Sequence, residues 1–218
     1  MNKTQLSRLA LIIVCALWMT FTKNLKAHAQ TTAHCSQLPS EVSPSIVRLE
    51  LSATNQASAI VIKHDTLLTV AHALPLGKAI KVYIKPEYTA TASIIAIHHG
   101  LDLAILKVDT QDLTPIPLTD SHLQFKERVW AAGFANRDWL NVTSGFFVKK
   151  NYKGLISSAS IEAGSSGGAL LHCGNKGLEL AGVLHAYKAR YEQGKLMNTG
   201  YSIAVPTEQF LSFIEQNT

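Results

Sequence analysis

Twelve short runs of apolar and β-branched residues, separated by turn-forming residues, follow one another from Pro44 almost to the end of this chain. The first six are Ser45–Leu51, Ala57–Lys63, Thr66–Val70, Ile80–Lys85, Ala90–Ile97 and Leu103–Val108. The second six are Arg128–Phe134, Val142–Lys149, Leu155–Ile161, Gly168–Leu171, Leu178–His185 and Gly200–Val205. Short strands at this spacing predict an all-β sandwich or a pair of barrels, and not a parallel α/β fold.

Two segments do not have the strand pattern: one lies between the two series of runs, and the other follows the second series. Residues 111–123 contain Pro115 and Pro117 and are typical of a connecting segment. Pro206 and the two residues after it are typical of a helix start, and an apolar face follows, made of Phe210, Leu211, Phe213 and Ile214. We therefore expect strand regions at about 45–115 and 124–206, then a C-terminal helix over 207–217.

Residues 1–29 have the pattern of a secretory signal peptide. Lys3 and Arg8 precede an apolar run of about 13 residues, and small residues at Ala27 and Ala29 suit a signal peptidase. The run is shorter than the roughly 20 residues that span a bilayer. The pattern predicts one exported domain, 30–218, with no membrane span and a periplasmic or secreted location. An uncleaved anchor is the alternative.

The basic balance of the chain comes mostly from this leader. The formal net charge is +5, but the leader contains Lys3, Arg8, Lys23 and Lys26 and no acid. Without those four, 16 basic residues face 15 acidic ones, so the expected mature chain is close to neutral. This charge gives no indication of a nucleic-acid partner.

Two cysteines, Cys35 and Cys173, remain after the predicted cleavage. Export permits disulfides, and an even count favours one bridge between the two. The alternative is a pair of free buried thiols.

A glycine-rich segment surrounds Ser166. Gly164 and the pair Gly167–Gly168 leave its backbone free of side-chain bulk. A nucleophilic serine needs a tight turn that exposes its hydroxyl and directs two N–H groups at one point, where they stabilise an oxyanion. The N–H groups of Gly164 and Ser166 are the candidates. A flexible Gly-Ser loop is the alternative, but an apolar strand follows at once.

A histidine and an aspartate occupy comparable positions earlier in the chain. His72 follows the run that ends at Val70 and lies between two alanines. Asp102 interrupts an apolar stretch, where a carboxylate is costly unless something pairs with it. Considered alone, His72 is also typical of a histidine in the core, and Asp102 is also typical of an ordinary turn. Together with Ser166 they predict a nucleophile, a general base and a group that orients the base. The order His, Asp, Ser argues against an α/β-hydrolase.

The sequence around the other histidines does not predict a metal site. His98 and His99 are adjacent, but the further ligands that zinc needs are missing at any usual spacing. The sequence therefore predicts no metal and no cofactor.

These segments resemble those of chymotrypsin-fold serine proteases, in particular the bacterial HtrA/Deg-type protease domain without a PDZ module. The matching segments are Thr69–His72, Asp102–Val108, Ala131–Phe134, Val142–Gly145, Ile161–Leu171 and Gly200–Pro206. The resemblance covers about 45–214 and implies two six-stranded antiparallel barrels with the site in the cleft between them. It also implies His72 as base, Asp102 as orienting group and Ser166 as nucleophile.

The resemblance is incomplete at several positions. Ser165 stands where the family usually has Asp or Asn, and Ala57–Ala59 replaces a glycine-bearing segment. By the family pattern, Ser160 falls near the base of the substrate pocket, and Val183, Leu184, His185 and Ala186 contribute a wall. With no acid at the base we expect a small or medium apolar side chain in the substrate. His185 either favours an acidic substrate residue or simply packs in the wall.

The resemblance thus implies an exported serine endopeptidase that acts on polypeptides through an acyl-enzyme. The main alternative is a silent or latent protein with a protease fold, which binds a partner and needs an activator. A serine esterase is the third hypothesis. The sequence does not indicate the oligomeric state.

Overall fold

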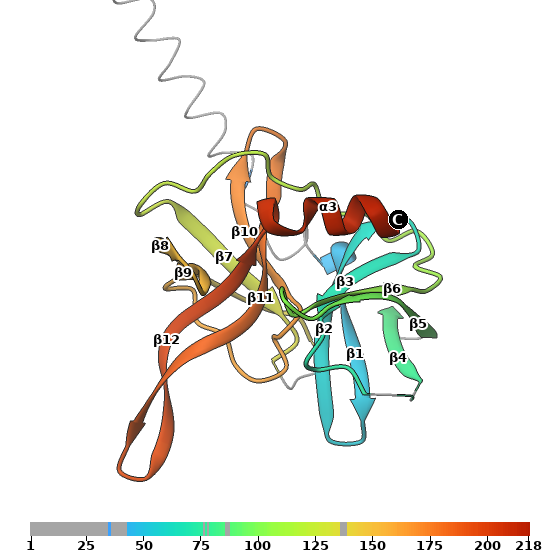
Figure 1. The fold of residues 1–218 in the computed structure, drawn as a ribbon, viewed down its shortest axis with the longest axis horizontal. Helices are drawn as coiled ribbons and strands as arrows, with labels where there is room; N and C mark the ends of the chain where they lie inside the picture. The colour runs from blue at the N-terminus through green and yellow to red at the C-terminus, as the bar shows by residue number, and fades with distance from the viewer. Residues whose placement is uncertain (1–34, 36–42, 76, 78, 86–87, 136–138) are drawn as a thin grey trace, which may run out of the picture. The chain divides into compact units, whose positions relative to one another are not determined.

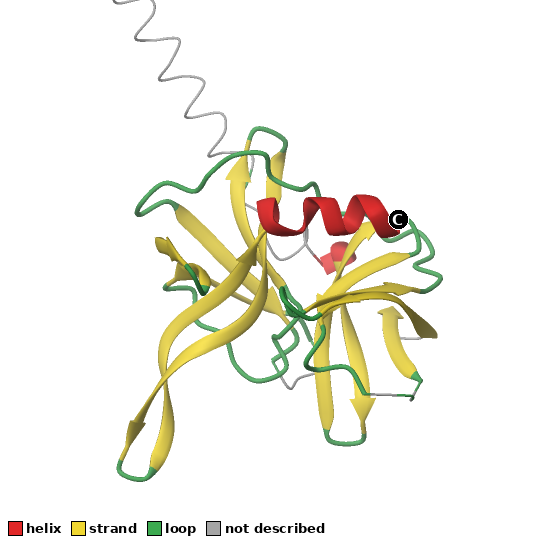
Figure 2. Ribbon diagram, viewed as in Figure 1, coloured by secondary structure: helices red, strands yellow, loops and turns green. Residues whose placement is uncertain are grey.

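The computed structural model describes residues 35, 43–75, 77, 79–85, 88–135 and 139–218. The chain divides into two compact units, Met1–Ser36 and Gln37–Thr218. Cys35 is the described residue of the first unit, and the predicted signal peptide lies outside the described residues. The second unit contains all the strands drawn in Figure 1 and, coloured by type, in Figure 2.

The first six strands close into an antiparallel barrel in the order β1-β2-β3-β6-β5-β4 (Figure 1). A short 3-10 helix, Ser43–Ser45, precedes them. The strands are β1 (Ile46–Ser52), β2 (Asn55–Lys63), β3 (Thr66–Val70), β4 (Ile80–Lys85), β5 (Tyr88–His98) and β6 (Leu103–Lys107).

The remaining strands close into a second antiparallel barrel in the order β10-β11-β12-β9-β8-β7. They are β7 (Arg128–Gly133), β8 (Asn141–Asn151), β9 (Gly154–Ser157), β10 (Ala169–Gly174), β11 (Gly177–Glu192) and β12 (Lys195–Pro206). A C-terminal helix, α3 (Thr207–Asn217), follows β12 directly. The predicted fold class, two six-stranded antiparallel barrels with a C-terminal helix, is confirmed.

Among the described residues, three apolar cores hold this arrangement together. One fills the first barrel, one fills the second, and a third lies between the barrels and under α3. β3 shows how one strand serves two of them: Leu67 packs inside the first barrel, while its neighbour Leu68 packs in the inter-barrel core. Successive side chains of a strand point to opposite faces, so a strand buried on both sides is apolar throughout.

Two strands extend well beyond their predicted bounds. The sequence predicted Leu178–His185 and Gly200–Val205, but β11 and β12 continue as a long hairpin with largely exposed residues (Figure 1). Its turn is Gln193–Gly194, with φ of +48° and +78°, which suits a two-residue hairpin loop. A polar exposed ladder lacks the alternation that marks a strand, so the sequence underestimated both.

Both predicted cysteine partners, Cys35 and Cys173, are disulfide-bonded, which confirms the predicted bridge. Disulfides persist in oxidising compartments outside the cytosol. Among the described residues, no helix is both long and apolar enough to cross a membrane.

Candidate active site

Adjacent strand ends bring His72 and Asp102 together. β3 pairs with β6 up to Val70 and Leu103, so the residues just outside the pairing are neighbours. The Ala71 N–H donates to the Asp102 carbonyl at 2.9 Å, which continues the ladder by one bond. Asp102 has a φ of +56°, a left-handed conformation that Asp adopts more readily than most residues. The turn aims its side chain back at His72.

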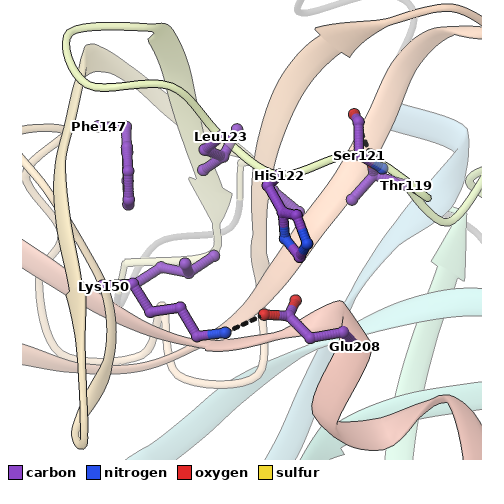
Figure 3. Close-up of a pocket in the computed structure, with 9 residues that line it drawn as sticks. Thr119, Ser121, His122, Leu123, Phe147, Lys150 and Glu208 are labelled. Atoms are coloured by element: carbon purple, nitrogen blue, oxygen red, sulfur yellow. Dashed lines mark hydrogen bonds and ion pairs between the residues drawn. The ribbon is translucent and has the colours of Figure 1, made fainter.

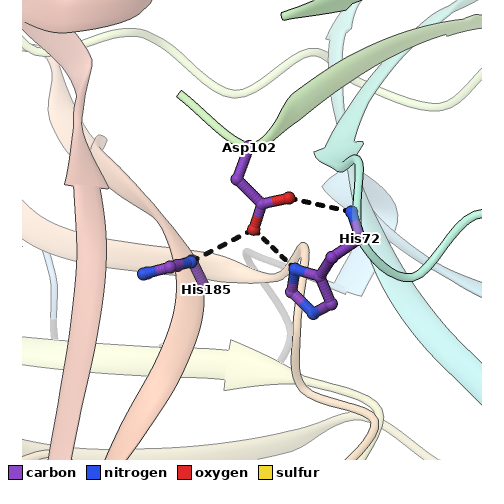
Figure 4. A group of neighbouring side chains, drawn as sticks. All are labelled: His72, Asp102 and His185. Carbon is purple, nitrogen blue, oxygen red and sulfur yellow. Dashed lines mark hydrogen bonds and ion pairs between the residues drawn. The ribbon is translucent and has the colours of Figure 1, made fainter. Parts of the chain in front are cut away.

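Both oxygens of the Asp102 carboxylate contact His72 (Figure 4). Oδ2 lies 2.5 Å from the ring Nδ1, and Oδ1 accepts the backbone N–H at 2.8 Å. Because a carboxylate only accepts, Nδ1 carries the proton. In the neutral ring Nε2 is then unprotonated, which is the tautomer that a general base requires.

A second imidazole reaches the same carboxylate from the other barrel. His185, on β11, places Nδ1 3.2 Å from Asp102 Oδ2, so the carboxylate lies between two rings in Figure 4. The rings of His72 and His185 are 6.4 Å apart at their centroids and nearly perpendicular. The sequence predicts a pocket-wall position for His185 and gives no sign of this contact, because no periodic signal relates residues on different barrels.

The surroundings keep Asp102 ionised. Burial alone raises the pKa of its carboxyl, but hydrogen bonds from the ring and backbone of His72 and from the ring of His185 outweigh burial, so the pKa lies below its ordinary value. Hydrogen bonds to the charged form favour that form. The carboxylate therefore stays an acceptor for both rings at neutral pH.

Ser166 lies in a tight turn that precedes β10. The Gly168 N–H donates to the Ser165 carbonyl at 2.9 Å, and the Gly167 N–H donates to the Leu184 carbonyl at 2.7 Å. Gly167 has a φ of +84°, and a Cβ there would lie 2.1 Å from the Ser58 carbonyl oxygen. Glycine is required here both by conformation and by this close approach.

Ser58, on β2, ties this turn to the first barrel. Its N–H donates to the Ser166 carbonyl at 2.8 Å, and its hydroxyl donates to the Gly164 carbonyl at 2.9 Å. The same hydroxyl accepts the Phe134 N–H at 2.8 Å, and the Ser58 carbonyl accepts the Thr69 hydroxyl at 2.7 Å. In the sequence, Ser58 is notable only as part of a departure from a family pattern. The available signal was a serine inside the apolar run Ala57–Ile62; the structure buries it fully.

The nucleophile candidate and the base candidate are not joined in this structure. Among the described residues, no hydrogen bond links the Ser166 hydroxyl to His72. The N–H groups of Gly164 and Ser166 likewise donate to no acceptor within the described parts of the chain. Two unpaired N–H groups on one glycine-rich turn can bind an oxyanion.

The predicted substrate-pocket residues have mixed surroundings. The side chains of Val183 and Leu184 belong to the inter-barrel core and the second barrel's core, respectively. Ser160 and Ala186 are half-buried, and the Ser160 carbonyl accepts the Thr143 hydroxyl at 2.7 Å. The pocket assignment stays a prediction.

A separate cavity of about 140 Å³ lies on the second barrel (Figure 3). An ion pair between Lys150 and Glu208 lies along it. Its lining contains no predicted site residue; it consists of Thr119, Ser121, His122, Leu123, Phe147, Lys150, Leu155, Ala181 and Glu208.

Comparisons with known proteins agree with this geometry. A family model described as a trypsin-like peptidase domain matches residues 57–178, a range that contains His72, Asp102 and Ser166. The crystal structure of the serine endoprotease from Yersinia pestis is similar, with a TM-score of 0.68 and 25% identity. That match covers 80% of this chain and 62% of the other, so this chain spans less than two thirds of that protein's length. A search of curated proteins found no match.

Proposed function

Because the chain belongs to the family of trypsin-like peptidase domains, we propose that it is an exported serine endopeptidase that uses His72, Asp102 and Ser166. The observation that carries the proposal is that both carboxylate oxygens of Asp102 are hydrogen-bonded to His72. This arrangement leaves the His72 Nε2 unprotonated and able to accept a proton. The tight turn around Ser166 supports it, as do its two N–H groups, which have no acceptor among the residues that the structure describes.

In the proposed reaction, the Ser166 hydroxyl attacks the substrate carbonyl while His72 Nε2 takes its proton. Asp102 stabilises the imidazolium that forms, and the N–H groups of Gly164 and Ser166 stabilise the negative oxygen. His72 then protonates the leaving amine, and an acyl-enzyme remains on Ser166. A water molecule, deprotonated by His72, releases the second product. Hydrogen bonds between nucleophile and base are often long without substrate, so an unjoined Ser166 is compatible with this scheme.

The domain and its location are part of the same proposal. Residues 1–29 act as a signal peptide, and 30–218 form the mature domain in the periplasm or outside the cell. The Cys35–Cys173 disulfide supports export, since such bonds are rare in the cytosol. Ser160, Val183, Leu184, His185 and Ala186 border the substrate pocket, which takes a small or medium apolar side chain.

Two observations favour a second candidate, a latent protein that becomes active on binding a partner. Ser166 and His72 are not hydrogen-bonded within the described residues, and Ser165 stands where the family usually has Asp or Asn. If the site needs an activator, the purified protein should be folded but should not cleave peptides.

A fluorophosphonate probe separates the two candidates. We expect the probe to label Ser166 of the purified protein, as mapped by mass spectrometry, with Ser166→Ala as the unlabelled control. Peptides blocked at both ends then test the endopeptidase assignment, because only cleavage of an internal bond releases products from them. A folded protein that is not labelled at Ser166 overturns the active-enzyme proposal and supports the latent form.

A further inference from the structure

We propose that His72, Asp102 and His185 together form a binding site for a divalent transition metal, best suited to Zn²⁺, which switches the site off when it is occupied. Each of the three residues offers one ligand atom, and these atoms all lie within 4.8 Å of one another. Within the described residues, no other group of three His, Cys, Asp or Glu side chains meets that distance.

Two of the three distances between ligand atoms can be compared with those of a zinc site. Zinc binds imidazole nitrogen and carboxylate oxygen at about 2.0–2.2 Å, so tetrahedral ligand atoms lie about 3.3 Å apart. His185 Nδ1 is already 3.2 Å from Asp102 Oδ2. His72 Nδ1 is at 2.5 Å, so this pair must open by about 0.8 Å to admit a metal ion with ordinary bond lengths. The His72 side chain is 49% exposed, which leaves room for that movement.

The ligand chemistry points to zinc. Two imidazoles and a carboxylate are borderline ligands of the kind that zinc prefers, and three protein ligands leave a fourth position for water. The three side chains remain 25–49% exposed, so a hydrated ion can reach them. The Asp102 carboxylate supplies one negative charge next to the ion, and its Oδ1 stays anchored by the His72 N–H.

Metal binding at this position displaces two hydrogen bonds and requires a change of tautomer. Each ring now donates from Nδ1, and a ring that binds metal through Nδ1 keeps its proton on Nε2 instead. In each ring the proton moves from Nδ1 to Nε2 through water. Both rings therefore stay neutral, and no proton is released overall. His72 Nε2 then carries a proton and can no longer accept one from Ser166. This consequence for activity rests on the proposed peptidase function, whereas the binding does not.

His185 completes the set of three ligands. His72 and Asp102 are already paired within the first barrel, and two ligands alone hold zinc weakly. The third ligand arrives from β11 of the second barrel, 83 residues after Asp102. The proposed metal therefore bridges the two barrels.

Direct titration tests the site without any assay of activity. The purified protein, freed of metal by a chelator, is titrated with Zn²⁺ against a coloured zinc chelator, and separately with Co²⁺ while the visible spectrum is recorded. We expect one equivalent to bind, with the intense cobalt absorption of a four-coordinate site. A folded protein that binds neither ion overturns the proposal.

Variants locate the bound ion. His185→Gln and His72→Gln should each weaken zinc binding by more than about 100-fold, since loss of an outer-shell partner alone costs about 10- to 100-fold. His64→Gln, which removes a histidine that is 77% exposed beside Asp65, is the matched control and should bind as the parent does. Circular dichroism verifies folding of each variant. Unchanged affinity in a folded His185→Gln or His72→Gln protein excludes this site.

Probe labelling tests the effect on Ser166. Zinc should slow fluorophosphonate labelling of the parent and a chelator should restore it, whereas zinc should change the labelling rate of His185→Gln little from that variant's own metal-free rate. If the parent is never labelled, the peptidase proposal fails while the zinc titration still decides the metal site. If zinc binds at the predicted residues but labelling continues unchanged, the inhibitory part of this proposal is wrong.

Discussion

Asp102 is the residue on which the chemistry of this site converges. Its two oxygens accept hydrogen bonds from the ring and backbone of His72, and one of them also faces the ring of His185. Three donors around one half-buried carboxylate keep it charged and fix its orientation. The carboxylate in turn selects the tautomer in which both rings are protonated on Nδ1.

Replacing this carboxylate by an amide should remove most of the activity and leave the fold in place. Asp102→Asn has only one accepting oxygen, so it cannot serve the two rings and the His72 backbone N–H together. If that oxygen stays on the backbone N–H, the amide NH2 faces His72 Nδ1 and favours the wrong tautomer of the ring. We expect turnover of a blocked peptide to fall by about 10,000-fold, as an equivalent change does in triads of this type. Asp109→Asn is the matched control, because Asp109 is also a turn aspartate with hydrogen-bonded oxygens but lies outside the site. A turnover that survives in Asp102→Asn contradicts the role given to Asp102.

The lowered pKa of Asp102 predicts how stability depends on pH. The group's ordinary pKa is 3.8 and its folded value is lower, so the unfolded chain binds more protons than the folded one as the pH falls. The stabilisation is therefore present above pH 3.8 and is lost as the pH falls through the folded value. We expect the difference in unfolding free energy between the parent and Asp102→Asn to shrink only below pH 3.8. A difference that does not change with pH contradicts the assignment.

Among the elements, β2 and the turn before β10 depend on each other through Ser58. The hydroxyl of Ser58 bridges the Gly164 carbonyl and the Phe134 N–H, and its backbone binds Ser166. One buried side chain on the first barrel thus positions the loop that carries the proposed nucleophile on the second.

Removal of this hydroxyl should loosen the turn. Ser58→Ala leaves a carbonyl and an N–H without partners, which we expect to lower the free energy of unfolding by about 1–3 kcal/mol. Probe labelling of Ser166 should slow as well. The control, Ser144→Ala, removes an exposed hydroxyl from β8 and should change stability by less than about 0.5 kcal/mol. Equal behaviour of the two variants in denaturant unfolding and labelling would rule out the bridging role.

The same turn depends on the absence of a side chain at Gly167. A Cβ there meets the Ser58 carbonyl oxygen at 2.1 Å and the Thr69 hydroxyl at 2.3 Å. Gly194, in the hairpin turn, has a similar φ of +78° but nothing within 4 Å of its Cβ position. Gly194→Ala should therefore cost about 1–2 kcal/mol from backbone strain alone.

Gly167→Ala should cost at least about 2 kcal/mol more than Gly194→Ala, because steric overlap with β2 and β3 adds to the strain. Denaturant unfolding of the pair measures the difference directly. If the two substitutions cost the same, the turn does not pack against Ser58 and Thr69 as described.

On the scale of the whole molecule, the inter-barrel core holds the two halves of the site in place. His72 and Asp102 belong to the first barrel, whereas Ser166 and His185 belong to the second half of the chain. Phe210 and Phe213 of α3 pack in the same core as Leu68 and Leu171 from the two barrels. The His98 ring, at the end of β5, contacts Phe213 edge-on at 5.5 Å. This histidine therefore packs against α3.

Truncation of the helix anchor should destabilise the molecule as a whole. Phe210 is fully buried, and Phe210→Ala should lower the free energy of unfolding by about 3–5 kcal/mol through lost burial and the cavity left behind. Leu211→Ala, one position along on the exposed side, should cost less than about 1 kcal/mol. Thermal or denaturant unfolding measures both. A small effect at Phe210 would mean that α3 is not part of the core.

Much of this protein could be read from its sequence because the signals are local. Short apolar runs and turn residues predicted the strands and the fold class, and a glycine-rich turn around Ser166 and isolated polar residues after strands marked the candidate site. These patterns arise from backbone geometry and burial within a few residues, so they need no knowledge of distant partners. The exposed ends of β11 and β12 were not predicted, because strands that face solvent on both sides show no alternation of apolar and polar residues.

Contacts across long separations were decided by the tertiary structure alone. Ser58 and Gly164 are 106 residues apart, and His185 and Asp102 are 83 apart, yet each pair shares a hydrogen bond. No periodicity links residues on different barrels; their meeting depends on how two closed sheets pack face to face. The sequence by itself determined the strands and the chemistry available, and the packing of the barrels determined which of those groups could act together.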